Sequence, residues 1–335
     1  MNSVKLRAEF HAKRLGRQIR HGFTPGSIIV IYHRIDEDAH DPWQLAVSPT
    51  HFAEHLGILA RWGTPMSLSR MAELAMNGAL PRRSIAITFD DGYVDNLHHA
   101  KPILEAHGVP ATVFVTAAFM RRETEFWWDE LQRIVLLPNT FPDALSLEIG
   151  SKTIHWNVLA DRAGQSFRDR LSLHDAVWRS IQPLSYQDRR ASLDRLHDLV
   201  GTPRGSRTDV RPLEAGEIVE LAQGGLIEIG SHTISHSSLR DLSLTELREE
   251  IVGAKTGIEE LLGQSVAGFS YPFGETGSAL NNIDKIVREA GFDWACTSGA
   301  RAIRGQCNPY FLPRFAIPNW SGASFTYHFV SRMLD

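Results

Sequence analysis

Cysteine, long apolar runs and excess positive charge are scarce in this sequence, and each shortage excludes a class of protein. The two cysteines, Cys296 and Cys307, cannot make a disulfide framework or a zinc knuckle, so we expect a reducing compartment. The apolar run at 28–32 is far too short to span a bilayer and predicts a strand. A formal net charge of -4 argues against a general nucleic-acid binder. What remains is a globular protein whose 43% of hydrophobic residues can build a sizeable core.

The N-terminal segment is basic and has no apolar core of the kind that a secretory signal needs. Lys and Arg residues are frequent within 1–21, and apolar residues recur there at helical spacing. We therefore expect a basic, weakly amphipathic helix at 1–26. It either makes peripheral contact with an anionic membrane or is solvated or docked on the protein. This predicts a cytoplasmic location, with the inner membrane face as one candidate place of action.

Short apolar runs alternate with helical patterns along most of the chain. Such alternation predicts a parallel sheet or barrel. A chain of 335 residues fits a (β/α) barrel with one insertion, so we expect barrel at 27–119 and 213–320 and a C-terminal tail at 321–335. The predicted strands are 27–32, 85–89, 111–116, 226–230, 268–271, 292–297 and 311–317. The predicted helices are 49–62, 67–77, 96–107, 214–223, 244–262 and 280–290.

Residues 120–212 interrupt this alternation. The stretch contains four tryptophans and charged helical patterns such as 186–199, and it ends in a Pro-, Gly- and Arg-rich hinge at 202–211. We expect a mostly helical insertion beside the barrel. It serves either as a lid or substrate wall or as a structural cap.

Two adjacent carboxylates, Asp90 and Asp91, follow the predicted strand at 85–89. Gly92 comes next and permits a sharp turn. Burying two neighbouring carboxylates is costly unless a cation or a proton offsets their charge. Functional residues of a (β/α) barrel lie at the carboxyl ends of its strands, which is where this pair falls. The pair therefore predicts one half of a metal site.

Two histidines supply the other half. His232 and His236 follow the predicted strand at 226–230. On a helical turn their i, i+4 spacing would place both imidazoles on one face, able to bind one ion together with Asp91. Such an Asp-His-His set leaves coordination positions open for water and substrate, so the sequence predicts a metal hydrolase.

Three segments resemble the motifs of one enzyme family. Thr88-Phe-Asp-Asp-Gly-Tyr93 and Ser231-His-Thr-Ile-Ser-His236 resemble the first two motifs of the polysaccharide deacetylases, carbohydrate esterase family 4 or the NodB-homology group. Ser270-Tyr-Pro-Phe-Gly274 resembles the third motif, in a form without its arginine. The resemblance covers the chain from about 28 to 319, apart from the insertion. It implies an α/β fold, a distorted (β/α) barrel of the polysaccharide deacetylase type.

The same resemblance implies a role for each matching residue. Asp91, His232 and His236 become the ligands of a zinc ion, or of cobalt or nickel, and Asp90 becomes the general base. A water molecule activated by the cation attacks an N-acyl carbonyl while Asp90 takes its proton. The metal and the backbone N–H of Tyr93 stabilise the oxyanion that forms.

The leaving amine also needs a proton, and here the sequence departs from the commoner family pattern. The chain has no Leu-x-His motif near its C-terminus, and His328 lacks that context. Ile31-Tyr-His-Arg34 instead resembles the branch with an N-terminal Tyr-His-Arg motif, which includes poly-β-1,6-N-acetylglucosamine deacetylases. By this resemblance His33 is the acid, since a histidine titrates near neutral pH, and a purely structural role is the alternative.

Other strand ends offer further site residues. Arg314 follows the last predicted strand closely enough to reach the same rim, where a cation would keep Asp90 ionised and oriented. The alternative for Arg314 is an ordinary surface position. Trp294 forms either a wall for the acetyl methyl group or part of the core. The residues expected to line the sugar groove are Tyr271, Pro272 and Phe273.

These features predict a metal-dependent hydrolase that removes N-acetyl groups from amino sugars, in exopolysaccharide biosynthesis. Its partner would be an N-acetylated glycan or a lipid-linked saccharide, and not a nucleic acid. Two alternatives remain open. One keeps the machinery but acts as a deformylase or amidohydrolase on a lipid-linked formamido sugar or a small amide. The other is a non-catalytic glycan-binding module.

Overall fold

The chain divides into two compact units. The larger comprises Met1–Glu37, Gln44–Arg122 and Leu213–Asp335, and the smaller comprises Asp38–Trp43 and Glu123–Pro212. The computed structural model describes residues 26–38, 40–121, 124–150, 152–157, 166–274 and 283–334. The basic helix expected at 1–26 therefore lies, but for its last residue, outside the described part of the chain.

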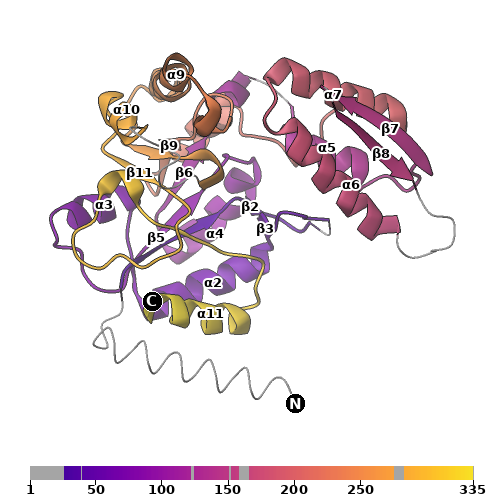
Figure 1. Cartoon of the computed structure of the whole chain (residues 1–335). Coiled ribbons are helices and arrows are strands. Elements are labelled where there is room, and N and C mark those ends of the chain that lie inside the picture. The colour runs from indigo at the N-terminus through magenta and orange to yellow at the C-terminus, as the bar shows by residue number, and fades with distance from the viewer. Residues whose placement is uncertain are drawn as a thin grey trace. The chain divides into compact units, whose positions relative to one another are not determined.

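A parallel sheet with helices around it forms the larger unit (Figure 1). Its strands follow the order β11-β10-β9-β6-β5-β1-β12, and β4 also pairs with β5. The Leu312 N–H donates to Ala295 O, and the Thr297 N–H donates to Leu312 O, both at 2.9 Å. These bonds join the β11 edge to the segment that leads into β12, so the sheet curls. The predicted distorted (β/α) barrel is confirmed.

The elements of the larger unit follow the predicted alternation. Its strands are β1 (Ile28–Tyr32), β2 (Arg34–Ile35), β3 (Ala46–Val47), β4 (Thr64–Pro65), β5 (Ser84–Phe89), β6 (Ala111–Val115), β9 (Ile227–Ser231), β10 (Gly268–Ser270), β11 (Trp294–Cys296) and β12 (Phe315–Ala316). Its α-helices are α2 (Pro49–Trp62), α3 (Leu68–Met76), α4 (Lys101–His107), α8 (Ala215–Ala222), α9 (Leu244–Leu262), α10 (Ile283–Glu289) and α11 (Gly322–Leu334). Short helical turns are η1 (Asn96–Ala100), η2 (Ala117–Arg121), η3 (Leu239–Asp241), η4 (Pro272–Gly274) and η6 (Pro309–Phe311).

The neighbouring strands β1 and β5 are buried on both faces. Every residue of β1 and β5 is buried. Ile28, Val30 and Tyr32 enter the main core cluster, whereas Ile29 packs into a second cluster with Trp294 and other residues. This period of two is the geometry of a strand covered on both sides, as in parallel sheets. It explains why both strands read as continuous apolar runs, and it brings their carboxyl ends to one edge.

Local signals in the sequence explain where the helices begin and end. Ser48 caps α2 by accepting the His51 N–H at 3.2 Å. In α9, Ser243 and Glu246 form a reciprocal capping box, and Gly263 ends the helix in the left-handed conformation. Within the described residues, no helix combines the length and the apolar character that a membrane-spanning segment needs.

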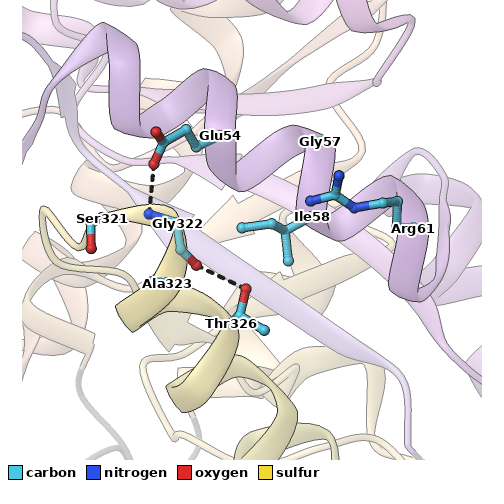
Figure 2. A pocket seen from close by; sticks show the side chains of 8 residues that line it. All are labelled: Glu54, Gly57, Ile58, Arg61, Ser321, Gly322, Ala323 and Thr326. Atoms are coloured by element: carbon cyan, nitrogen blue, oxygen red, sulfur yellow. Dashed lines mark hydrogen bonds between the residues drawn. The ribbon is translucent and has the colours of Figure 1, made fainter.

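Helix α11 occupies most of the predicted C-terminal tail at 321–335. It packs against α2, where the ring of Phe325 stacks on that of His55 with the ring centroids 4.0 Å apart. Glu54 of α2 accepts a hydrogen bond from the Gly322 N–H at 2.6 Å. A pocket of about 590 Å³ lies between these two helices. Figure 2 shows Ile58 and Thr326 among the residues that line it. None of the candidate site residues lines it.

The smaller unit is helical but also contains a hairpin. Its helices are α5 (Trp127–Val135), α6 (Ser166–Ile181) and α7 (Tyr186–Val200), and its strands β7 (Ala144–Ile149) and β8 (Lys152–Asn157) pair antiparallel. The expectation of a mostly helical insertion omitted this hairpin. The unit also has an interior of its own, where Glu130 accepts two hydrogen bonds from Arg190 and lies 2.9 Å from His197 Nε2.

Candidate active site

The turn after β5 presents two buried carboxylates. Asp90 and Asp91 are each 4% exposed, and the Asp90 N–H donates to Tyr32 O at 3.0 Å. Asp91 and Gly92 both adopt left-handed conformations, with φ of 70° and 69°. A Cβ atom on Gly92 would approach Val115 Cγ1 to 2.8 Å, so both the conformation and the space require glycine. This turn places the Asp91 carboxylate at the rim of the sheet.

The turn after β9 brings two imidazoles to Asp91. Its Oδ1 atom lies 3.5 Å from His232 Nε2 and 3.3 Å from His236 Nε2, and all three side chains are buried. The other ring nitrogen of His232 lies 2.8 Å from Ser270 O, which fixes the ring orientation. The helical turn assumed from the i, i+4 spacing was wrong. Thr233 and His236 have φ of 66° and 53°, so the rings converge through a tight non-helical turn.

These three residues fit a single divalent cation. One ligand atom from each of Asp91, His232 and His236 lies within 4.8 Å of the others. Two atoms that bind one tetrahedral zinc ion at about 2.0–2.1 Å lie roughly 3.4 Å apart, which is close to the spacing of Asp91 Oδ1 from each Nε2 atom. Asp91 Oδ1 is buried and makes no hydrogen bond within the described residues. Such an atom needs a cation or a proton, so the donor set suits a metal ion.

Arg314 holds the second carboxylate through a bidentate ion pair. Its two terminal nitrogens donate to the two oxygens of Asp90, each at 2.7 Å, and its side chain is fully buried. The remaining donors bond Thr88 Oγ1, Ser270 Oγ and Thr297 O at 3.3, 2.8 and 3.2 Å. All five N–H groups of the guanidinium therefore have acceptors. Arg314 lies at the rim and not on the open surface.

The charges of these groups oppose the effect of burial. Burial raises the pKa of Asp90, but the Arg314 charge, with smaller effects of His232 and His33, holds it below its usual range. Burial likewise raises the pKa of Asp91, and the two histidines outweigh it and lower that pKa. Burial lowers the pKa of His236, whereas the two carboxylates raise that of His232 despite its burial. Both carboxylates are therefore ionised at neutral pH.

His33 and Tyr93 lie at the same edge. His33, in the break between β1 and β2, is half-buried and within electrostatic reach of both Asp90 and Asp91. Its carbonyl accepts a hydrogen bond from Asn96 Nδ2 at 2.9 Å, which fixes the backbone of that break. Tyr93 directly follows the Asp91–Gly92 turn, and its side chain is fully buried. Its predicted contribution is the backbone N–H and does not need an exposed ring.

Of the residues predicted to contact the sugar, Phe273 alone suits that role. Its ring is 41% exposed and packs edge-on against His236, with ring centroids 4.7 Å apart. Tyr271 is fully buried between Phe269 and Phe311, and Pro272 is buried as well. Neither can form an open groove wall.

Of the two predictions for Trp294, an acetyl-binding wall or a core position, its packing supports the core position. Its ring packs against Phe114 and over Gly268, where a Cβ atom would come within 2.0 Å of it. Gly268 is the first residue of β10, whereas the candidate site lies at the carboxyl ends of the strands. Trp294 is therefore a core residue.

Ser270 is a site residue that the sequence analysis did not single out. Its hydroxyl donates to Asp90 Oδ2 at 3.1 Å and accepts from Arg314, while its carbonyl faces His232. Ser270 therefore connects the Asp90–Arg314 ion pair to His232, one of the three candidate metal ligands. Its position as the last residue of β10, directly before Tyr271, was the available signal, because that is where site residues of such a sheet lie.

Comparisons with known proteins identify the family of this chain. The sequence profile of the polysaccharide deacetylase family matches residues 77–181 and 204–295. The chain is also 34% identical over 302 residues to YxkH of Bacillus subtilis (strain 168), whose name assigns it provisionally to the polysaccharide deacetylases, and the match covers 89% of this chain and 74% of YxkH. This chain belongs to the polysaccharide deacetylase family. The family predicted from the motifs is confirmed, whereas the Tyr-His-Arg branch stays a prediction.

Solved structures share the fold. The deacetylase PplD of Streptococcus pyogenes, solved in complex with acetate, superposes with a TM-score of 0.57 at 17% identity and covers 91% of this chain and 98% of its own. IcaB of Ammonifex degensii gives a TM-score of 0.56 at 19% identity, covering 92% of this chain and 97% of its own. At such identities the likeness concerns the fold alone.

Proposed function

We propose that this protein is a metal-dependent hydrolase that removes N-acetyl groups from amino sugars of a polysaccharide or a glycan precursor. The observation that carries the proposal is the arrangement of two differently held carboxylates. Asp91 Oδ1 faces the Nε2 atoms of His232 and His236, while Asp90 is clamped by Arg314. One carboxylate is thus placed to bind a cation and its neighbour to take a proton.

Each residue then has a distinct task. A zinc, cobalt or nickel ion held by Asp91, His232 and His236 would polarise the amide carbonyl and make a water molecule acidic. Asp90, kept ionised by Arg314, accepts the proton of that water. His33 donates a proton to the leaving amine from the carboxyl end of β1, the parallel neighbour of β5.

Around this reaction, other groups of the chain hold the substrate. The Tyr93 N–H stabilises the oxyanion that develops on the carbonyl oxygen. The exposed face of Phe273, beside His236, offers an apolar surface to the acylated sugar. We assign substrate contact to Phe273 and not to Tyr271, Pro272 or Trp294, which are buried.

The glycan and its location belong to the same proposal. The Tyr-His-Arg segment favours the branch that includes poly-β-1,6-N-acetylglucosamine deacetylases, and with it a role in exopolysaccharide biosynthesis. The basic segment at 1–26 favours action in the cytoplasm at the inner membrane face, on a lipid-linked saccharide. A formyl group, a small amide or a bound but unhydrolysed glycan are the alternatives that the first experiment separates.

Elemental analysis of the purified protein, with acetate release from N-acetylglucosamine oligomers, tests the proposal. We expect about one zinc per chain and acetate release that a chelator abolishes and added zinc restores. A protein that binds metal but releases no acetate would indicate a hydrolase that acts on formylated, lipid-linked or small amide substrates. Protein that binds no metal even after reconstitution would contradict the hydrolase and leave the glycan-binding module.

Replacing His33 with alanine should reduce turnover by about a hundredfold or more, because the leaving amine loses its proton donor. The metal content should not change, since His33 is not among the three candidate ligands. Steady-state rates and elemental analysis of the same preparation check both statements. His107→Ala, at the exposed end of α4, is the matched control and should retain full activity. An unchanged rate for His33→Ala would exclude it as the acid.

A further inference from the structure

The turn between His232 and His236 has an unusual backbone. Thr233 and His236 both lie in the left-handed region, which residues with side chains adopt only when their surroundings stabilise it. This conformation turns the His236 ring toward Asp91. Whatever holds the turn therefore also holds one of the three candidate metal ligands.

Glu250 on α9 accepts three hydrogen bonds from this turn. Its Oε2 atom accepts the N–H groups of Ile234 and Ser235, both at 2.9 Å, and its Oε1 atom accepts the Ser235 hydroxyl at 2.6 Å. Helix α9 packs beside β9, the strand from which the turn emerges (Figure 1). Because the acceptor is a carboxylate, these bonds are of the short and strong kind.

The other polar groups of the turn are held at its two sides. Thr233 O and Ile234 O accept the N–H groups of Ala117 and Ala118 at 3.0 and 2.8 Å. The Thr233 hydroxyl accepts the His236 N–H at 3.1 Å. These contacts fix the carbonyls on one side, while Glu250 fixes two successive N–H groups on the other. Without Glu250 those two donors would lose their acceptor, directly between the two histidines.

We propose that Glu250 is a positioning residue for the metal site. It fixes the Ile234–Ser235 backbone and so holds His236 Nε2 beside Asp91 Oδ1. The inference rests on the proposed metal-dependent function and adds a residue 14 positions beyond the ligand, on another element. Its role is to reduce the reorganisation that cation binding needs, as hydrogen-bonded neighbours of metal ligands generally do.

Zinc titration in competition with a chromophoric chelator tests this on the full chain. Glu250→Ala should bind zinc about 10- to 100-fold more weakly than the wild type. Glu250→Gln should recover most of the affinity, because its carbonyl can accept the two N–H groups and its amide can donate to the Ser235 hydroxyl. Glu249→Ala, exposed on the same helix, is the matched control and should bind as the wild type does.

Two further measurements keep the outcome decisive. Melting of the metal-free variants separates folding from binding, because a merely structural role would lower the melting temperature and leave the affinity of the folded protein unchanged. If Glu250→Ala does not fold, Ser235→Ala removes one of the three bonds and should weaken zinc binding by less. Wild-type affinity in the folded Glu250→Ala or Ser235→Ala protein would overturn the inference. A wild type that binds no zinc would instead contradict the proposed function.

Discussion

Asp90→Asn should reduce turnover by about 100- to 10,000-fold and leave one metal ion per chain in place. The amide cannot accept the proton of the attacking water, whereas the candidate metal ligands Asp91, His232 and His236 are unchanged. Steady-state rates of acetate release and elemental analysis of the same sample measure the two effects. The separation matters because it distinguishes a base from a ligand at two adjacent positions of one turn.

His232→Ala is the contrasting variant. It removes a ligand whose Nε2 atom lies 3.5 Å from Asp91, so both metal and turnover should be lost. Metal loss in Asp90→Asn would show that both carboxylates bind the cation and that the base lies elsewhere. Retained turnover in Asp90→Asn would exclude Asp90 as the base. Rates are compared well below the melting temperature of each variant, because the substitution leaves the buried Arg314 without its carboxylate.

Sequence reasoning located elements well where local chemistry determines them. Helices α2 and α9 begin and end where predicted. A capping serine precedes each helix, and Gly263 ends α9 in the left-handed conformation. The hairpin of β7 and β8 was missed although β7 carries a period-two signal, with Leu145, Leu147 and Ile149 buried and the residues between them exposed. That signal was obscured by the surrounding helical patterns of the insertion.

In the candidate site, too, the residues that a local sequence signal marks could be predicted and the others could not. Asp90, Asp91, His232 and His236 were found because each follows a strand that is visible in the sequence. Ser270, 180 positions beyond Asp90, was missed, since its partner becomes apparent only when the sheet order is known.

The burial of Tyr271 and Trp294 could not be predicted for a different reason. The sequence pattern around an aromatic residue near a strand end is the same whether its ring faces the core or the solvent. Only the packing separates the buried Tyr271 from the exposed Phe273, two positions later.

Removing the guanidinium at position 314 should destabilise the fold strongly. Arg314→Met leaves the carboxylate of Asp90 buried without its bidentate partner, which costs about 3–5 kcal/mol in comparable cases. Asp90→Asn leaves the Arg314 guanidinium buried without a carboxylate and should also be destabilising. Urea unfolding of the metal-free proteins measures both changes, since bound metal would add its own stabilisation.

The double variant, Asp90→Asn with Arg314→Met, should lose far less stability than the two single variants together. Once both charges are gone, neither group is left buried and unpaired, and methionine fills part of the space of the arginine. The surface pair Arg248–Glu289, joined at 2.7 Å but exposed to solvent, is the matched control and should show little coupling, because water screens it. Additive losses at positions 90 and 314 would mean that the ion pair does not act as a unit. Strong coupling would show that the base is kept ionised by the partner that also stabilises the fold, so that Arg314 cannot be varied without affecting both.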